Sequence, residues 1–316
     1  MAKQSGQGAG QGRRLGGVFA PVATPFGADL APDVRRFVRH CRWLLEHGCA
    51  GLAPFGTTSE ANSLSVGERE ALLDALLAEG IPADRLMPGT GCCALPDSVR
   101  LTAHAVRRGC AAVLMLPPFY YKGVSDDGLF RSFAEVVERV GDERLRVFLY
   151  HIPPIAQVGF GPKLVERLLA AYPRAIAGMK DSSGDFGNTR TMLDAFAKDG
   201  FQVFVGSERF LLDNLRAGGV GCITATGNIN AAAIERVYAG WQGPGADRLQ
   251  DELNVVRGLV EKVPVIPAVK AVIAEWSGDA GWATVRPPLV ALAPERRDPL
   301  LAELRARGFE MPGLRG

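Results

Sequence analysis

The sequence predicts an α/β fold, a (β/α)8 TIM barrel with a C-terminal helical appendage. From Gly16 onward, a short apolar run, a polar turn and an amphipathic helix repeat eight times, which is the rhythm of this barrel. The 316 residues are 47% hydrophobic, which suffices for a large core. The first apolar run leads into Thr24-Pro25-Phe26-Gly27 and lacks the GxGxxG turn of a dinucleotide-binding open sheet, the main structural rival.

The repeat also divides the chain. Residues 1–14 are rich in glycine and glutamine and lack apolar periodicity, which predicts a disordered tail. The catalytic barrel is expected over residues 15–240 and a C-terminal helical domain over residues 241–316. Strands are expected at residues 18–23, 50–54, 86–89, 111–116, 145–150, 175–180, 201–205 and 220–225.

The helices between these strands have recognisable starts. Pro32-Asp33 opens a helix that runs to His47, and Ser65 with Glu68 three residues later forms a capping box. Further barrel helices are expected at residues 96–108, 162–171, 188–198, 208–217 and 231–238. One more helix is expected to follow the Tyr120-Tyr121 turn and to end at about residue 140. The appendage is expected to hold helices at residues 245–261, 265–276 and 295–307.

Composition excludes several classes of function. The net charge is +2 and no block of Lys or Arg stands out, so neither a nucleic-acid partner nor a membrane partner is expected. Six cysteines, none in CxxC spacing, and the lack of a visible signal peptide predict free thiols and a cytoplasmic location. Four histidines without HxH or HExxH spacing, and no carboxylate cluster at the strand ends, predict neither a metal nor a cofactor.

The residues at the carboxyl ends of the expected strands carry the chemistry of such a barrel. Lys180 ends the run 175–180, and a buried lysine has a lowered pKa and becomes a nucleophile towards carbonyls. Tyr150 ends the preceding strand and is suited to general acid/base work. The Gly56-Thr57-Thr58 loop offers backbone N–H groups and hydroxyls as a cradle for a carboxylate.

Each of these residues also has an ordinary structural interpretation. The head of Lys180 can escape into solvent at the strand end, and Tyr150 can be a rim aromatic with a hydrogen-bonded hydroxyl. His151 is interpreted as a packed, satisfied histidine. Asp181 and Glu208 are interpreted as charges at the starts of helices. The structural interpretation of the remaining polar residues is that they lie in turns, loops or interfaces: Thr57, Thr58, Tyr120 and Tyr121.

The combined pattern resembles the class I, Schiff-base-forming pyruvate lyases related to dihydrodipicolinate synthase and N-acetylneuraminate lyase. The resemblance extends over about residues 15–305, in order and with sensible spacing. The matching motifs are Gly56-Thr57-Thr58-Ser59-Glu60, Pro118-Phe119-Tyr120-Tyr121, Tyr150-His151-Ile152-Pro153, Gly178-Met179-Lys180-Asp181-Ser182-Ser183-Gly184-Asp185 and Ile266-Pro267-Ala268-Val269-Lys270.

The resemblance implies a role for each matching position. Lys180 would form the Schiff base, Tyr150 would relay protons, and Thr57 would belong to the hydroxyl relay. Thr58, with the backbone of the Gly56 loop, would hold the carboxylate of the keto acid. Tyr120, or alternatively Tyr121, would reach across a subunit interface of a homodimer or homotetramer. Ile223 would lie on the wall near the bound pyruvate unit, and Gly206 and Glu208 fall where the sialic-acid lyases hold a polyol.

The distal pocket departs from both relatives. In dihydrodipicolinate synthases, an arginine soon after the turn that corresponds to Tyr150-His151-Ile152-Pro153 binds the carboxylate of the second substrate. This chain instead continues with residues 154–159, PIAQVG. Arg209, in the segment that follows strand 201–205, either faces a second carboxylate or is solvated on its helix, and the sequence favours solvation. The apolar Pro154-Ile155 segment suggests a smaller or less polar acceptor.

The prediction is therefore a cytoplasmic 2-keto acid aldolase that joins or cleaves pyruvate and an aldehyde through a Lys180 iminium. Two alternatives use the same lysine: a 2-keto-3-deoxy sugar acid dehydratase and a 4-hydroxy-tetrahydrodipicolinate synthase. An alternative of another class is a non-catalytic regulatory protein that binds a keto acid. A phosphate-binding barrel that uses Gly206-Ser207 and Gly227-Asn228 is a further rival, and it leaves Lys180 and Tyr150 unexplained.

Overall fold

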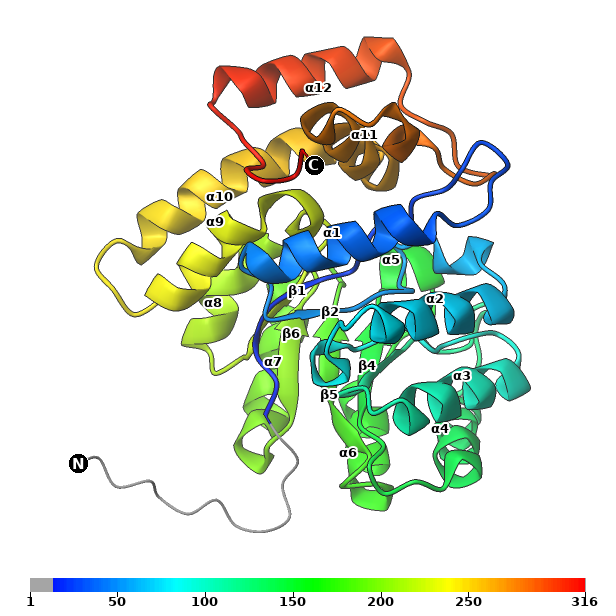
Figure 1. Ribbon diagram of the computed structural model, residues 1–316. Coiled ribbons are helices and arrows are strands. Elements are labelled where there is room, and N and C mark those ends of the chain that lie inside the picture. Colours follow the sequence, from blue (N-terminus) through cyan, green and yellow to red (C-terminus); the bar gives the residue numbers. More distant parts are fainter. Residues whose placement is uncertain (1–13, 316) are drawn as a thin grey trace, which may run out of the picture.

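The computed structural model describes residues 14–315, so the predicted disordered tail lies outside the described residues apart from Arg14. Seven parallel strands form one sheet in the order β2-β1-β7-β6-β5-β4-β3. Helices surround the strands, as Figure 1 shows. The strands are β1 (Gly17–Ala20), β2 (Gly51–Leu52), β3 (Val113–Met115), β4 (Val147–His151), β5 (Ile176–Asp181), β6 (Gln202–Val205) and β7 (Gly221–Ile223).

Residues 86–90 close the sheet into a barrel. Leu86 bridges Leu52 of β2 and Gly89 bridges Leu114 of β3, both in parallel. The segment forms no regular strand because Pro88 has no N–H to donate. Gly89 is also needed here, because a Cβ at this position would lie 2.0 Å from the carbonyl oxygen of Phe55. The predicted (β/α)8 barrel is thus confirmed, with its third strand reduced to bridges.

The barrel helices begin at the predicted signals. The Asp33 side chain accepts a hydrogen bond from the Arg36 N–H at the start of the first helix, and Ser65 and Glu68 form the predicted capping box. A short helix after the tyrosine turn, α5 (Pro153–Ala156), was not predicted. The other barrel helices are α1 (Val34–Glu46), α2 (Val66–Ala78), α3 (Leu95–Arg107), α4 (Asp126–Val140), α6 (Pro162–Ala171), α7 (Phe186–Phe196), α8 (Leu211–Arg216) and α9 (Gly227–Gly240).

Three further helices follow the barrel: α10 (Ala246–Glu261), α11 (Val265–Ser277) and α12 (Pro294–Ala306). They lie together on one side of the molecule (Figure 1), where α10 and α11 pack against α9. The domain boundary at residues 240/241 stays a prediction. The cysteines are free, as expected, and the part of the chain that the structure describes has no helix long and apolar enough to cross a membrane.

Large side chains fill the inside of the barrel and support the layer in which Lys180 lies. Phe204 packs edge-on against Phe19 and Phe148, with ring centroids 5.4 and 5.6 Å apart. Gly178 leaves room for Phe148, since a Cβ there would lie 2.6 Å from that ring. Two residues further along β5, on the same inward face, is Lys180. The aromatic layer of Phe19, Phe148 and Phe204 thus lies below Lys180 in the barrel interior.

Glu68 has a second partner that makes the fold sensitive to acid. Arg286 donates to its carboxylate, which lowers the pKa of Glu68 from 4.5 to about 2. Because the folded pKa is depressed, the stabilisation is full above pH 4.5 and is lost as the pH falls towards 2. We expect Glu68→Gln, which keeps the capping box, to lower the free energy of unfolding by about 1 kcal/mol at pH 7 after solvent screening. Urea titrations at pH 7 and pH 3 measure this, and the difference from wild type should shrink at pH 3. Glu310→Gln, an exposed control, should change neither value.

Candidate active site

Lys180 lies at the carboxyl end of β5, inside the barrel. Its side chain is 4% exposed, so the alternative in which its head escapes into solvent is wrong. In the register of β4 and β5 it is paired with Tyr150, and its Nζ lies 4.2 Å from the centroid of the Tyr150 ring. Within residues 14–315 no carboxylate forms an ion pair with this Nζ. The lysine therefore lines the cavity without an ion-pair partner among these residues.

Tyr150 connects the lysine to the loop after β2. Its side chain is 4% exposed, and its hydroxyl shares a hydrogen bond of 3.1 Å with Thr57 Oγ1. Either hydroxyl can be the donor. Tyr150 and Thr57 thus form a hydrogen-bonded pair of hydroxyls that can pass a proton, and the Tyr150 ring lies against Lys180 Nζ.

The loop that holds Thr57 and Thr58 is a tight turn with two free donors. The Ser59 N–H donates to the Gly56 carbonyl at 3.1 Å, and the Glu60 N–H donates to the Thr57 carbonyl at 3.0 Å. Among the described residues, the N–H groups of Thr57 and Thr58 have no acceptor. Adjacent free N–H groups in a turn form a concave site for an anion. The geometry therefore fits the carboxylate cradle expected from the sequence.

A buried ion pair fixes the end of this loop. Glu60 adopts a left-handed backbone conformation, with φ 56°, and its Oε1 lies 2.5 Å from Lys270 Nζ of α11. Both side chains are fully buried. The other carboxylate oxygen of Glu60 accepts from the Arg286 N–H at 2.9 Å. Glu60 ends the motif of this loop and Lys270 ends the motif at residues 266–270, so their ion pair ties the Thr57-Thr58 loop to the C-terminal helices.

These groups open into a cavity of about 550 Å³, a size typical of small-molecule sites. Lys180, Tyr150, Thr57 and Thr58 line one part of it. Arg209, Arg257 and Glu261 line a second, charged part of the cavity, and the last two belong to α10. The intervening walls are mostly apolar and are formed by Ile152, Ile155, Phe210, Ala225, Pro264, Val265, Ile266, Pro267 and Leu289.

The charged part of the cavity was not predicted from the sequence. Arg257 and Glu261 are four residues apart on α10 and are linked by a 2.7 Å ion pair, a spacing that reads as an ordinary surface pair. Arg209, which the sequence favoured as solvated, is 39% exposed, and it also lines the cavity and pairs with Glu261 at 2.7 Å. The packing of α10 against residues 208–210, which follow β6, brings these residues to the cavity.

Glu208 differs from its expected role as a substrate-binding residue. Its side chain is fully buried and does not line the cavity. Its carboxylate accepts hydrogen bonds from the hydroxyls of Thr224 and Thr226, and Arg257 Nη1 lies 3.1 Å from it. With these partners satisfied, the carboxylate has no free edge for a substrate. Glu208 instead holds Arg257 from behind the cavity wall.

The other expected residues occupy varied positions. Gly206 lines the cavity, and its N–H donates to the Asp181 carbonyl. Ile223, expected on the wall near the pyruvate unit, is fully buried in the hydrophobic cluster that also contains Tyr150, and it does not line the cavity. Tyr120 is 74% exposed on the loop before α4 and, within the described chain, lies outside the cavity.

Two polar neighbours of the site have structural partners. His151 is buried, which lowers its pKa, and its Nδ1 accepts from the Phe160 N–H at 3.0 Å. Asp181 accepts from the Ser183 N–H and from the side chains of Asn188 and Thr189 at the start of α7. Both agree with the structural interpretation made from the sequence.

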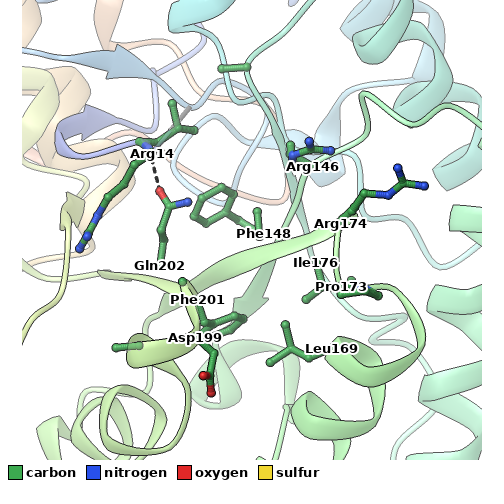
Figure 2. A pocket seen from close by; sticks show the side chains of 15 residues that line it. Arg14, Arg146, Phe148, Leu169, Pro173, Arg174, Ile176, Asp199, Phe201 and Gln202 are labelled. Atoms are coloured by element: carbon green, nitrogen blue, oxygen red, sulfur yellow. Dashed lines mark hydrogen bonds between the residues drawn. The ribbon is translucent and has the colours of Figure 1, made fainter. Parts of the chain in front are cut away.

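A second cavity of about 210 Å³ lies at the opposite ends of the strands, around Ile176 of β5 and Gln202 of β6. Figure 2 shows Arg146 and Arg174 on one side of it and Arg14 on the other, so the three guanidinium groups do not converge. The amino ends of barrel strands generally serve stability, whereas catalytic groups collect at the carboxyl ends. The cavity at Lys180 is therefore the candidate active site.

Known proteins share this arrangement of the chain. The sequence profile of the Dihydrodipicolinate synthetase family matches residues 14–307. An uncharacterised DapA-like lyase of Chloroflexus aurantiacus is 32% identical over 292 residues, which cover 92% of this chain and 95% of the relative.

Two solved structures are also similar. The crystal structure of dihydrodipicolinate synthase from Agrobacterium tumefaciens matches with a TM-score of 0.84 and 34% identity, over 92% of this chain and 98% of that one. The structure of YagE from E. coli, in complex with pyruvate, matches with a TM-score of 0.84 and 25% identity, over 93% and 99% of the two chains.

Proposed function

This chain belongs to the dihydrodipicolinate synthetase family and is a class I, Schiff-base lyase; on that premise we propose that it is a 2-keto acid aldolase acting on pyruvate and an aldehyde through Lys180. One observation carries the assignment of residues. Lys180 is buried without a counter-ion in a large cavity and touches the Tyr150 ring, whose hydroxyl is hydrogen-bonded to Thr57.

The first half of the proposed reaction forms the iminium. The carboxylate of pyruvate binds the free N–H groups of Thr57 and Thr58, which places the ketone beside Lys180. Nζ attacks the ketone carbon to give a carbinolamine, and water leaves as the C–N double bond forms. Tyr150 donates the proton that the departing hydroxyl needs, and Thr57 carries protons to and from Tyr150.

The second half makes the carbon–carbon bond. The iminium draws electrons from the neighbouring methyl group, which loses a proton to the deprotonated Tyr150 and gives an enamine. The enamine carbon attacks the aldehyde, and the new alkoxide takes that proton back from Tyr150. Water then adds to the iminium, which releases the product and restores Lys180. Cleavage of a longer keto acid follows the same steps in reverse.

The product distinguishes aldol chemistry from the alternatives. Pyruvate is incubated with a panel of aldehydes, and 2-keto-3-deoxy acids are offered separately. We expect carbon–carbon bond formation or cleavage; loss of water from the deoxy acids without cleavage would make the protein a dehydratase instead. A trapped adduct without any product would mean a keto-acid-binding protein.

A second candidate is dihydrodipicolinate synthesis, favoured by the likeness to the Agrobacterium synthase. Against it, the turn after Tyr150 forms α5 and brings Ile155 to the cavity, where a carboxylate-binding arginine was expected for that reaction. The aldehyde panel resolves this candidate too, since aspartate semialdehyde would then be the preferred acceptor.

Tyr120 remains part of the proposal as a residue acting between subunits. Tyr120 and Tyr121 are 74% and 72% exposed and pack edge-on against each other, with ring centroids 5.3 Å apart. An exposed aromatic pair is typical of an interface. We propose that it completes the relay of a neighbouring copy in a homodimer or homotetramer. The proposed location is the cytoplasm.

Tyr150→Phe should separate proton transfer from binding. The variant keeps the ring beside Lys180 and removes only the hydroxyl, so we expect turnover to fall by about 10²- to 10⁴-fold, the usual worth of a general acid/base. Iminium formation, measured as the fraction of protein that borohydride traps with pyruvate after long incubation, should change much less. Tyr172→Phe is the control, since the Tyr172 hydroxyl bonds Glu138 on the surface. An equal loss of turnover and trapping would mean that Tyr150 only positions the ligand.

A further inference from the structure

The charged part of the active-site cavity contains one carboxylate held by two guanidinium groups. Glu261 Oε2 lies 2.8 Å from Arg209 Nε and 2.7 Å from Arg209 Nη2. Glu261 Oε1 lies 2.7 Å from Arg257 Nε. Paired guanidinium groups around a carboxylate are the arrangement by which proteins recognise acidic substrates. In this cavity the carboxylate belongs to the protein.

Arg257 keeps its position without Glu261. Its Nη1 lies 3.1 Å from both the Glu208 carboxylate and the Thr224 hydroxyl, which are fully buried. Its own side chain is 10% exposed. Arg209 has less support of this kind: its Nη2 lies close to Gly258, where an added Cβ would approach to 3.3 Å. Removal of Glu261 would thus leave an anchored arginine and a more mobile one.

The charges balance only while Glu261 is present. Glu208 compensates Arg257 from behind the wall, and Glu261 compensates Arg209. The lowered pKa of Glu261, caused by hydrogen bonds from Arg257 and Arg209 that outweigh its burial, keeps it charged. A carboxylate on the acceptor would be repelled by the charge of Glu261 and would also lose hydration among the apolar walls. An acceptor with an uncharged chain has neither of these costs.

We propose that Glu261 determines the specificity of the cavity. Its carboxylate occupies a two-arginine anion site and thereby restricts the acceptor to aldehydes that carry no carboxylate. This inference rests on the proposed aldol function. It is an exclusion device, in which a group of the protein rejects the wrong substrate. Removing the carboxylate exposes Arg209 and Arg257 and makes the same cavity suited to an acidic acceptor.

Glu261→Ala tests this with two acceptors of equal chain length, butanal and succinic semialdehyde, which differ by a carboxylate. For wild type we expect a higher kcat/KM with butanal. In the variant the ratio should move towards succinic semialdehyde by about tenfold or more. Adding Arg209→Ala to the variant should abolish most of that gain. Glu252→Ala is the matched control, because Glu252 pairs with Arg248 on the exposed face of the same helix and should leave the ratio unchanged.

A second readout needs no turnover. Borohydride trapping compares 2-oxoadipate with 2-oxohexanoate, keto acids of equal length that differ in a terminal carboxylate, and the trapped fraction should shift in the same direction. Glu261→Gln, which keeps the size of the side chain, replaces Glu261→Ala if the latter melts at a much lower temperature. An unchanged preference in both assays, with pyruvate still trapped on Lys180, overturns the inference and leaves the aldolase proposal standing. Failure of wild type to trap pyruvate overturns the aldolase proposal itself.

Discussion

Lys180→Ala should abolish the pyruvate adduct and lower turnover by about 10⁴-fold or more, because the variant lacks the group that forms the covalent intermediate. Borohydride reduction in the presence of pyruvate, followed by peptide mass mapping, should place the adduct of wild type on the peptide that contains Lys180. No other lysine among the described residues both lines the cavity and lies beside Tyr150.

The structure also predicts that this variant folds. Within the described chain Lys180 forms no ion pair, so its removal leaves no buried carboxylate uncompensated. A thermal unfolding curve near that of wild type therefore separates lost chemistry from lost structure. Lys163→Ala, an exposed lysine on α6, is the matched control and should keep both adduct and activity. Turnover by Lys180→Ala at the wild-type rate would refute the Schiff-base assignment.

Lys270→Met should destabilise the protein by about 3–5 kcal/mol, because it leaves the Glu60 carboxylate buried beside an apolar side chain. The midpoint and slope of urea unfolding measure this change. Lys262→Met is the matched control: Lys262 also pairs with a glutamate, Glu303, but both side chains are exposed, so we expect a loss of at most about 1 kcal/mol.

The same substitution should weaken the binding of pyruvate. Glu60 ends the turn that presents the Thr57 and Thr58 N–H groups, so a displaced Glu60 shifts the proposed cradle. We expect KM for pyruvate to rise more than kcat falls. Adding Glu60→Gln to Lys270→Met removes the unpaired charge and should recover part of the stability, which a double-mutant cycle detects. A destabilisation no greater than that of Lys262→Met would show that the pair contributes little.

Much of the fold and the centre of the site could be predicted from the sequence. The alternation of apolar runs and helical patterns depends on local residue spacing, and it located the strands to within a few residues. In a parallel barrel all carboxyl ends meet at one face, so consecutive strands that end in Tyr150 and Lys180 had to bring these side chains together. The capping box at Ser65 and Glu68 is equally local.

The tertiary structure alone decided the surroundings of that centre. Lys270 and Glu60 are 210 positions apart, and no local pattern says that they form a buried pair. Glu208 points away from the cavity because buried hydroxyls and a guanidinium group bind its carboxylate. The pair Arg257–Glu261 reaches the cavity because α10 packs against residues 208–210, which follow β6. The sequence by itself determined the barrel and the reactive lysine, because spacing and strand direction suffice for both. The shape and charge of the acceptor site arise from contacts between distant segments, and these exist only once the chain is packed.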